Sequence, residues 1–411
     1  MKRAVLRACR IARMLRAQKK HISFHTPGHK RAGADITELP YSDNLLSPTG
    51  VLAQTEREIA DILGADASFL LTDGSTCGIF SMLYALRRAG GRSVAVPAYA
   101  HRSVFNACEV LGLNAVAVEQ SVARGIPAQP SAKQMADALE RADALLVTSP
   151  DYYGYFPDLA AARKLCDVAG KPLIADGAHG SHLKGTPRYA GLYADMWVDG
   201  VHKSLPALTQ GAVVSARGAW ASRLAEGVRV FRTTSPSYPI MASVEYAVRF
   251  PRNRAIESAA EEAKRALGAL DNEDWSKIVL PFGTASAQAE AYFEAHRIYC
   301  EFDDGNYLMF YLSPASKRRE LKKLVRLAAR LPRGEIACAP PVAGMAGGKT
   351  VVLPPAEAVG RTCARDCGLF PPCLPLIRRG ERVTAESAAR LARAANTFGL
   401  TDGKIEVFEE A

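Results

Sequence analysis

The sequence predicts an α/β protein in which a large domain with a mostly parallel, seven-stranded sheet is followed by a smaller α+β domain. The chain has 411 residues, of which 48% are apolar, and is longer than a single core usually fills. Seven short apolar runs alternate with helical patterns between residues 66 and 215, as in a parallel sheet covered on both faces. Beyond residue 270 this alternation stops. We therefore expect a large domain with an N-terminal helical segment over residues 1–270, and a small domain over residues 271–411.

The apolar runs are separated by recognisable helix boundaries. Ser131 can cap a helix that continues through Arg141, and Asp158 opens another helix that Gly170 closes. The predicted strands are residues 68–72, 93–97, 115–119, 144–148, 172–176, 196–199 and 212–215.

The C-terminal part has a different pattern. Residues 254–270 form a charged helical connector, which is a suitable domain boundary. After it we expect a strand at 307–312, a basic helix at 317–331, a Pro- and Gly-rich stretch through residue 355 and a last helix at 384–398.

The net charge of +10 is concentrated at the N-terminus. Residues 1–20 hold eight basic side chains and no acidic one, so the rest of the chain has 44 basic and 42 acidic residues. These residues form an amphipathic helical pattern. One interpretation is a targeting or membrane-surface helix. We prefer a helix docked on its own domain or on a partner subunit, because a motif-rich segment follows at once.

Other classes of protein are excluded by the composition. No run of 18 or more apolar residues occurs, and no segment has the pattern of a secretory signal. The nine cysteines are odd in number and scattered, so no disulfide framework follows. Cys363, Cys367 and Cys373 cluster without a nearby histidine, and we expect no metal site there. We expect a cytoplasmic protein that binds neither membrane nor nucleic acid.

Polar side chains follow the predicted strands, at the edge of the sheet where ligands bind in such folds. Seven of the eight histidines lie within residues 21–202. The first strand leads into Gly74, Ser75 and Thr76 at a helix start, where backbone donors, two hydroxyls and the helix dipole can hold an anion. Helix capping explains one hydroxyl equally well, so both interpretations stay open.

Two further strands end in a carboxylate and an amine. Asp176 follows a buried strand, where a carboxylate needs a cation or hydrogen-bond donors. Lys203 follows the next strand, although alone it could be a solvated loop lysine. Together, the anion site, the aspartate and the lysine are explained most economically by pyridoxal 5′-phosphate. This cofactor needs a phosphate site, an acid partner for its pyridine nitrogen and an amine for a Schiff base.

The same residues resemble the ornithine/lysine/arginine decarboxylases of the aspartate-aminotransferase-like fold, in their short bacterial form without an N-terminal response-regulator-like wing. The resemblance covers nearly the whole chain and is most specific around Lys203. The resembling segments are 23–30 (SFHTPGHK), 74–76 (GST), 100–103 (AHRS), 148–150 (TSP), 152–154 (YYG), 176–180 (DGAHG), 202–210 (HKSLPALTQ) and 235–238 (SPSY), and Pro371-Pro372 with Pro375 and Gly380-Glu381.

The resemblance implies a role for each matching position. Lys203 would hold the cofactor as a Schiff base, Asp176 would pair with the pyridinium nitrogen, and Ser75 and Thr76 would bind the phosphate. The segment 25–30 would lie near the active site. The implied catalytic residues are Lys203, His202, Asp176 and His101. The implied cofactor-binding residues are Lys203, Asp176, Ser75, Thr76, Gly74, His202 beside the phosphate, His101 on one face of the ring, Ala178 on the other, and His179.

Several positions depart from the family pattern. Gly177 stands where glutamate is usual, Asp73 where asparagine is usual, and Gly200 where a phosphate-binding serine is expected. Cys373 replaces a usual glycine. The missing hydroxyl at Gly200 costs about 1 kcal/mol if nothing replaces it. None of these changes removes the amine or the ring carboxylate, so they bear on substrate choice more than on the cofactor.

We therefore expect a decarboxylase that converts arginine, lysine or ornithine to its amine in polyamine-type metabolism, working as a homodimer as the resemblance implies. For the distal cation of such a substrate, Glu301, Asp303 and Asp304 are candidate partners. The alternatives are another pyridoxal-phosphate reaction, such as that of an aminotransferase or lyase, and a relative that binds the cofactor with reduced catalysis.

A nucleotide-binding protein is the rival from another class. Residues 343–350 (AGMAGGKT) resemble a phosphate loop. Ala343 occupies the first glycine position, however, and the apolar residues 351–355 follow where a helix must begin. We reject this interpretation.

Overall fold

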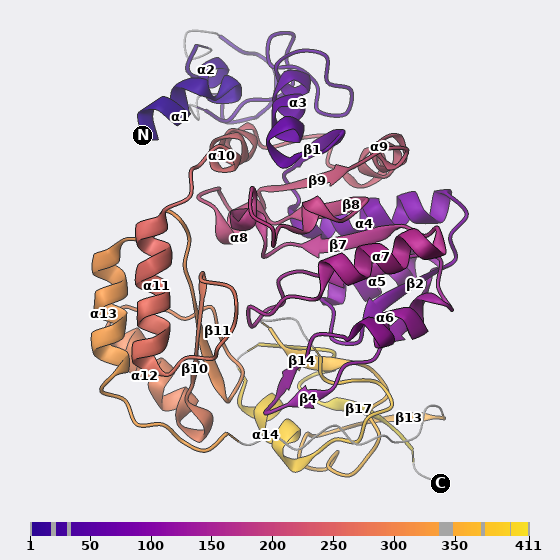
Figure 1. The fold of residues 1–411 in the computed structure, drawn as a ribbon, viewed down its shortest axis with the longest axis vertical. Helices are drawn as coiled ribbons and strands as arrows, with labels where there is room; N and C mark the ends of the chain where they lie inside the picture. The colour runs from indigo at the N-terminus through magenta and orange to yellow at the C-terminus, as the bar shows by residue number, and fades with distance from the viewer. Residues whose placement is uncertain are drawn as a thin grey trace.

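A seven-stranded sheet forms the centre of the larger part of the molecule (Figure 1). The computed structural model describes residues 2–17, 22–30, 34–336, 348–370, 375–394 and 396–409. The strand order in the sheet is β1-β9-β8-β7-β6-β2-β3. The bounds are β1 Ala67–Leu71, β2 Ser93–Pro97, β3 Asn114–Val118, β6 Leu145–Thr148, β7 Leu173–Gly177, β8 Met196–Asp199 and β9 Ala212–Ala216.

All seven predicted strands are present. The neighbouring strands β3, β2, β6, β7 and β8 pair in parallel, and only β9 pairs antiparallel with both of its neighbours in this sheet. The predicted fold class, a mostly parallel seven-stranded sheet, is thus confirmed. Because parallel strands end at one edge, the residues that follow β1, β2, β6, β7 and β8 meet there.

Helices cover both faces of the sheet. Successive strand residues point to opposite sides, and both sides carry apolar side chains. Leu146 and Ile174 pack into one core, and Leu145 and Leu173 pack into the other. The first core holds α4 Gly74–Arg88, α5 Arg102–Leu111 and α9 Trp220–Phe231. The second core holds α3 Val51–Leu63, α6 Ala132–Leu139, α7 Leu159–Ala169 and α10 Tyr238–Val248.

The predicted helix caps are confirmed at both helices between the central strands. The Ser131 side chain accepts from the Gln134 N–H at the start of α6, and Asp158 accepts from the Ala161 N–H at the start of α7. Gly170 ends α7 in the left-handed conformation that favours glycine. The short elements of this part are α8 Val201–Ser204, η2 Ser181–Leu183, η3 Ala190–Leu192, and the hairpin of β4 Val122–Ala123 and β5 Ile126–Pro127.

The basic N-terminal segment forms two helices, α1 Lys2–Ala8 and α2 Arg10–Ala17. Helix α2 buries Ile11 and Leu15 in the core that it shares with α3 and α10. The buried carboxylate of Glu245 on α10 accepts from the Arg10 N–H and, at 2.9 Å, from the Ile11 N–H. These are the amide groups that a helix start leaves unpaired. Docking of this segment on its own domain is therefore confirmed for α2.

The C-terminal part contains several small sheets (Figure 1). Strands β10 Lys277–Pro281, β12 Tyr307–Tyr311 and β11 Phe302–Asp303 form one sheet, packed with α11 Arg254–Leu267, α12 Ser286–Ala295, beginning after η4 Gly283–Ala285, and α13 Arg318–Ala328. The remaining elements are the pair β13 Thr350–Leu353 and β17 Ile405–Phe408, the sheet of β15 Pro375–Ile377, β14 Cys367–Leu369 and β16 Thr397–Phe398, and helix α14 Ala385–Arg393.

The domain boundary at residue 270 stays a prediction. Helix α11 ends at Leu267, and its residues Ala263 and Leu267 share a core with Leu280 on β10 and Leu324 on α13. The charged connector thus packs with the elements that follow it.

One detail of the C-terminal part differs from the predictions, and another agrees with them. The last helix ends at Arg393 instead of residue 398, because Ala394 is extended and Thr397–Phe398 pairs with β14. Thr350–Leu353 is a strand, which agrees with the rejection of a phosphate loop; residues 343–347 lie outside the described residues, as do Pro371, Pro372 and Cys373. In the described ranges, no helix is long and apolar enough to cross a bilayer.

Replacing Glu245 with alanine should lower the free energy of unfolding by about 1–3 kcal/mol, because two helix-start amides lose their acceptor. Hydrogen exchange of residues 10–17 should rise in the same variant. Denaturant unfolding and exchange mass spectrometry measure both. The control is Glu226→Ala, since this side chain is 55% exposed and lies 4.0 Å from Arg88. Its change should stay within about 0.5 kcal/mol. An equal change in both variants would contradict the role of Glu245.

Candidate active site

A cavity of about 310 Å³ lies at the edge of the sheet where the parallel strands end. The segments after β1, β2, β6, β7 and β8 line it, together with Phe370 from the C-terminal part. The structure brings the nine residues predicted as catalytic or cofactor-binding to this one cavity. They are Gly74, Ser75, Thr76, His101, Asp176, Ala178, His179, His202 and Lys203.

Asp176 is a buried carboxylate at the end of β7. Its position is fixed by parallel pairing with Thr148 on β6 and Val198 on β8. The residue is 4% exposed, and its Oδ1 accepts from the Ala178 N–H at 3.1 Å. A carboxylate held in this way favours a cationic partner, because burial without one raises its free energy.

His101 precedes α5 and caps it. Its Nδ1 accepts from the Ser103 N–H at 3.2 Å, which places the proton of the neutral ring on Nε2. Burial lowers the pKa of His101, Asp176 opposes this effect, and Lys203 adds to it. Burial thus favours the neutral form of this imidazole.

Lys203 lies on α8, the single helical turn after β8. Its Nζ is 3.2 Å from Nε2 of His179, which follows β7. The preceding residue, His202, is held by a 3.0 Å hydrogen bond from its Nδ1 to the Gly211 carbonyl. Burial lowers the pKa of His202, the Gly211 contact opposes this, and Lys203 adds to it. A neutral His202 thus has Nε2 available as a proton acceptor.

The start of α4 has the properties of an anion site. Gly74 has a φ of 75°, the left-handed region, and its N–H donates to the Gln210 carbonyl at 2.9 Å. Asp73 occupies the N-cap position without a side-chain cap bond. The buried Oγ of Ser75 has no hydrogen-bond partner among the described residues. The capping interpretation therefore does not account for Ser75.

Gly200 makes room for this hydroxyl. A Cβ at position 200 would lie 2.4 Å from the Ala178 carbonyl oxygen and 2.9 Å from Ser75 Oγ. At this position the backbone that follows β7 lies too close to the backbone that follows β8 for a side chain to fit. Gly177 is similarly confined, since a Cβ there would lie 2.9 Å from the Val198 carbonyl oxygen.

Sequence reasoning missed the aromatic support of His179. The His179 ring stacks on Tyr311, with 5.6 Å between the centroids and 15° between the planes. Tyr152 lies 4.7 Å from the same ring, and burial lowers the pKa of His179 well below its ordinary value. Tyr311 belongs to a predicted strand, but no local pattern relates that strand to a residue 132 positions earlier.

The segment 25–30 does not line this cavity. Lys30 Nζ donates to the His25 carbonyl at 2.6 Å, and His29 pairs with Asp35 at 2.9 Å. None of the described residues 22–30 is among those that line the cavity. Its proximity to an active site stays a prediction.

The three candidate carboxylates of the C-terminal part differ in their surroundings. Asp304 accepts from the Tyr153 hydroxyl at 2.7 Å and from the N–H groups of Asn306 and Tyr307, so it serves the local fold. All three carboxylates line a second cavity of about 370 Å³, which shares Phe370 with the first.

Comparison with known proteins assigns the family. The profile of the Orn/Lys/Arg decarboxylase major domain matches residues 28–272. The chain belongs to the Orn/Lys/Arg decarboxylase family. It is 27% identical to the Bacillus subtilis protein "Uncharacterized protein YaaO", over 96% of this chain and 95% of that protein. It is 25% identical to an arginine decarboxylase of Halalkalibacterium halodurans, over 93% of this chain and 92% of the relative.

Solved structures show the same fold. The Francisella novicida lysine decarboxylase LdcF has a TM-score of 0.76 at 17% identity, covering 98% of this chain and 81% of that chain. A structure described as SPT with PLP has a TM-score of 0.55 at 16% identity, covering 68% of this chain and 76% of that one. The predicted pyridoxal-phosphate transferase-like fold class is thus confirmed for this family member.

A serine at position 200, the residue expected in the family, should not strengthen cofactor binding here. Gly200→Ser places a side chain against the Ala178 carbonyl and should lower the stability by about 1–3 kcal/mol and weaken binding of pyridoxal phosphate. Thermal unfolding and a binding titration measure these effects. Gly28→Ala, at a position with no atom within 4 Å, is the stability control. Tighter cofactor binding by Gly200→Ser would contradict the packing argument.

Proposed function

We propose that this chain is a pyridoxal-phosphate-dependent decarboxylase of a basic amino acid. One observation carries the proposal: a buried aspartate, a lysine amine and a buried unpartnered hydroxyl line one cavity in a member of the Orn/Lys/Arg decarboxylase family. Names of relatives such as the Halalkalibacterium halodurans arginine decarboxylase support the substrate class.

The residues present fit this cofactor. Three buried polar atoms around the cavity have no hydrogen-bond partner in the described part of the chain: Ser75 Oγ, Thr148 Oγ1 and His179 Nδ1. A ligand with phosphate oxygens and ring substituents supplies partners for such atoms. Lys203 would hold the cofactor aldehyde, Asp176 the pyridine nitrogen, and Ser75 with Thr76 the phosphate.

The catalytic roles follow from the positions of these side chains. Pyridoxal phosphate, when bound, supplies an electron sink for the pair left by a broken bond at the substrate α-carbon. Asp176 favours the protonated ring nitrogen that makes this sink effective. The proton that replaces carbon dioxide on the α-carbon would come from Lys203 in its ammonium form, or from the adjacent His202 after its Nε2 has taken up a proton. Phe370 and Tyr152 supply apolar parts of the cavity wall.

We propose a homodimer that acts in the cytoplasm in polyamine-type metabolism, as the family resemblance implies. Ile22 is 88% exposed and Phe24 is 94% exposed, which supports a surface that a second chain covers. Size-exclusion chromatography with light scattering tests this state.

Lys203→Ala should abolish turnover and the visible absorption of the bound cofactor. The assay measures labelled carbon dioxide from carboxyl-labelled arginine, lysine and ornithine. Lys171→Ala is the matched control, because Lys171 donates to the Leu139 carbonyl at the opposite edge of the sheet. Transfer of the amino group without loss of carbon dioxide would favour an aminotransferase, and normal absorption without any reaction would favour a relative with reduced catalysis.

Glu301→Gln should raise the KM for the preferred basic substrate about tenfold and change kcat less, if its carboxylate holds the distal cation. The Tyr152 hydroxyl donates to Glu301 at 3.3 Å, which places this carboxylate near the cavity wall. Steady-state kinetics with Glu294→Gln as the control measures the effect. An unchanged KM would remove Glu301 from the substrate site.

A further inference from the structure

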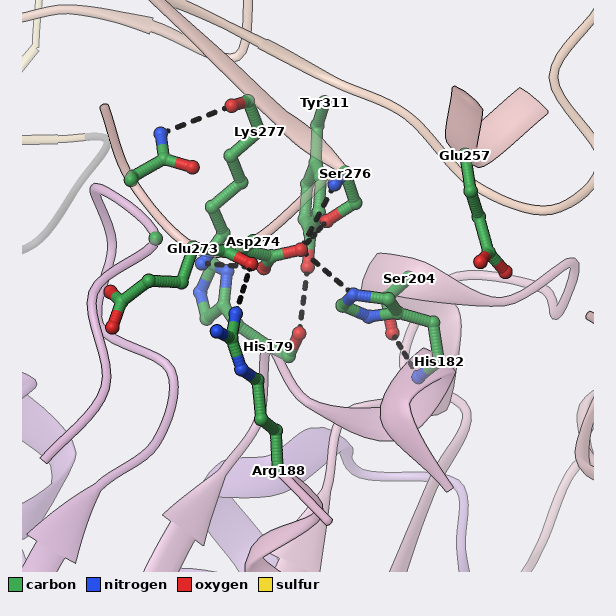
Figure 2. Close-up of polar contacts among 12 residues, drawn as sticks. His179, His182, Arg188, Ser204, Glu257, Glu273, Asp274, Ser276, Lys277 and Tyr311 are labelled. Carbon is green, nitrogen blue, oxygen red and sulfur yellow. Dashed lines mark hydrogen bonds and ion pairs between the residues drawn. The ribbon is translucent and has the colours of Figure 1, made fainter. Parts of the chain in front are cut away.

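A buried lysine lies behind the wall of the cavity. Lys277 is the first residue of β10, and its Nζ lies 3.6 Å from Oδ2 of Asp274; both side chains are 0% exposed. Asp274 Oδ1 lies 2.9 Å from His182 Nε2 and accepts from the Ser276 hydroxyl at 2.7 Å. Figure 2 shows this group. We call it the Lys277 cluster: His182, Asp274, Ser276 and Lys277.

Buried charges of this kind cost free energy unless partners hold them. Burial pushes the pKa of Asp274 upward, but His182, Lys277 and Ser276 together hold it below its ordinary value. Burial lowers the pKa of Lys277; Asp274 and Asp151 oppose this, and Lys203 adds to it. Lys277 Nζ also donates to the carbonyl of Asp151, a residue that lines the cavity. The cluster is thus coupled to the cavity without lining it.

Three consecutive contacts lead from Lys277 to Lys203. Lys277 and Tyr311 are partners in the antiparallel pair of β10 and β12, and Lys277 Nζ lies 5.6 Å from the centre of the Tyr311 ring. The Tyr311 ring stacks on His179, and its hydroxyl donates to the His179 carbonyl at 3.1 Å. His179 Nε2 then lies 3.2 Å from Lys203 Nζ.

We propose that Lys277 is a positioning residue for Lys203, fixing His179 against the amine through Tyr311 while its cation favours the uncharged amine. The inference rests on the proposed function only for the identity of Lys203 as the cofactor attachment point. A cation near a second amine disfavours protonation of that amine. The His179 imidazole can donate a hydrogen bond to the uncharged amine of Lys203 or accept one from its ammonium form. The contact can therefore form in either protonation state of Lys203.

The charges around His179 have a consistent sign. Burial lowers its pKa, and the basic groups that face it lower it further. The basic groups are Lys203 on α8, Lys277 on β10, His101 before α5 and His182 on η2. Two tyrosine rings also face His179, Tyr152 after β6 and Tyr311 on β12. The nearby carboxylates act on the neighbours of His179: Asp176 on His101, and Asp274 and Asp151 on Lys277. Removing the Lys277 cation should therefore ease protonation of the His179–Lys203 pair.

The test follows attachment of pyridoxal 5′-phosphate to Lys203 in the full chain as a function of pH. The adduct is fixed with borohydride, and the Lys203 peptide is quantified by mass spectrometry. In Lys277→Met the midpoint of attachment should move up by about one pH unit, a tenfold loss of attachment at a fixed lower pH. In Tyr311→Leu, which removes the stack, attachment at the optimal pH should slow by about tenfold.

Lys264→Met is the matched control, because Lys264 is also a buried lysine but its Nζ binds Asn272. Lys264→Met should leave the midpoint of attachment unchanged, because it removes a buried lysine whose partner is Asn272. Lys277→Met leaves Asp274 buried without its lysine; if it does not fold, Lys277→Gln, which keeps a donor toward Asp274 and the Asp151 carbonyl but removes the charge, should show the same upward shift. The inference is overturned if the folded Lys277 variant keeps the wild-type midpoint of attachment and Tyr311→Leu keeps the wild-type rate. It is also overturned if pyridoxal 5′-phosphate does not attach to Lys203 at any pH. Normal attachment without carbon dioxide release would instead overturn the proposed function alone.

Discussion

The parallel pairing of β7 with β8 fixes where the chemistry of this chain can take place. Asp176 and Gly177 pair with Val198 and Asp199, so both strands end at one level of the sheet. Asp199 is buried, and its Oδ2 accepts from the Tyr189 hydroxyl at 2.6 Å and from Trp197 Nε1 at 3.1 Å. Burial raises the pKa of Asp199 to about 6, and those two donors oppose the shift. This anchored strand end carries α8, and with it Lys203, to the level of Asp176.

The later part of the chain completes the site from the opposite side. The sheet edge presents the amine, the carboxylate and the candidate anion site, while Tyr311 and Lys277 come from the small sheet of β10, β11 and β12. Further contacts join the two parts, with the Arg102 guanidinium over the Phe398 ring at 5.1 Å and that of Arg378 over Tyr99 at 5.0 Å. Tyr99 and Phe370 both line the cavity, so residues of the two parts share its wall.

The sequence was sufficient for the sheet and for the residues at its edge, but not for their support. Strand runs such as 93–97 and 196–199 are predictable because β-branched residues, helix caps and turn glycines are local signals. Asp176 and Lys203 could be found because the ends of parallel strands converge. Tyr311 and Lys277 could not, since their contacts with residues of the sheet depend on how two distant segments pack. Position 200 shows a further limit: the family pattern expects a hydroxyl there, whereas local packing leaves room only for glycine.

The most direct test of this account is a crystal structure of the chain grown with pyridoxal 5′-phosphate. The account predicts density continuous with Lys203 Nζ, a ring nitrogen facing Asp176, and a phosphate against Ser75 and Thr76. Density joined to another lysine, or a phosphate bound away from the start of α4, would contradict it.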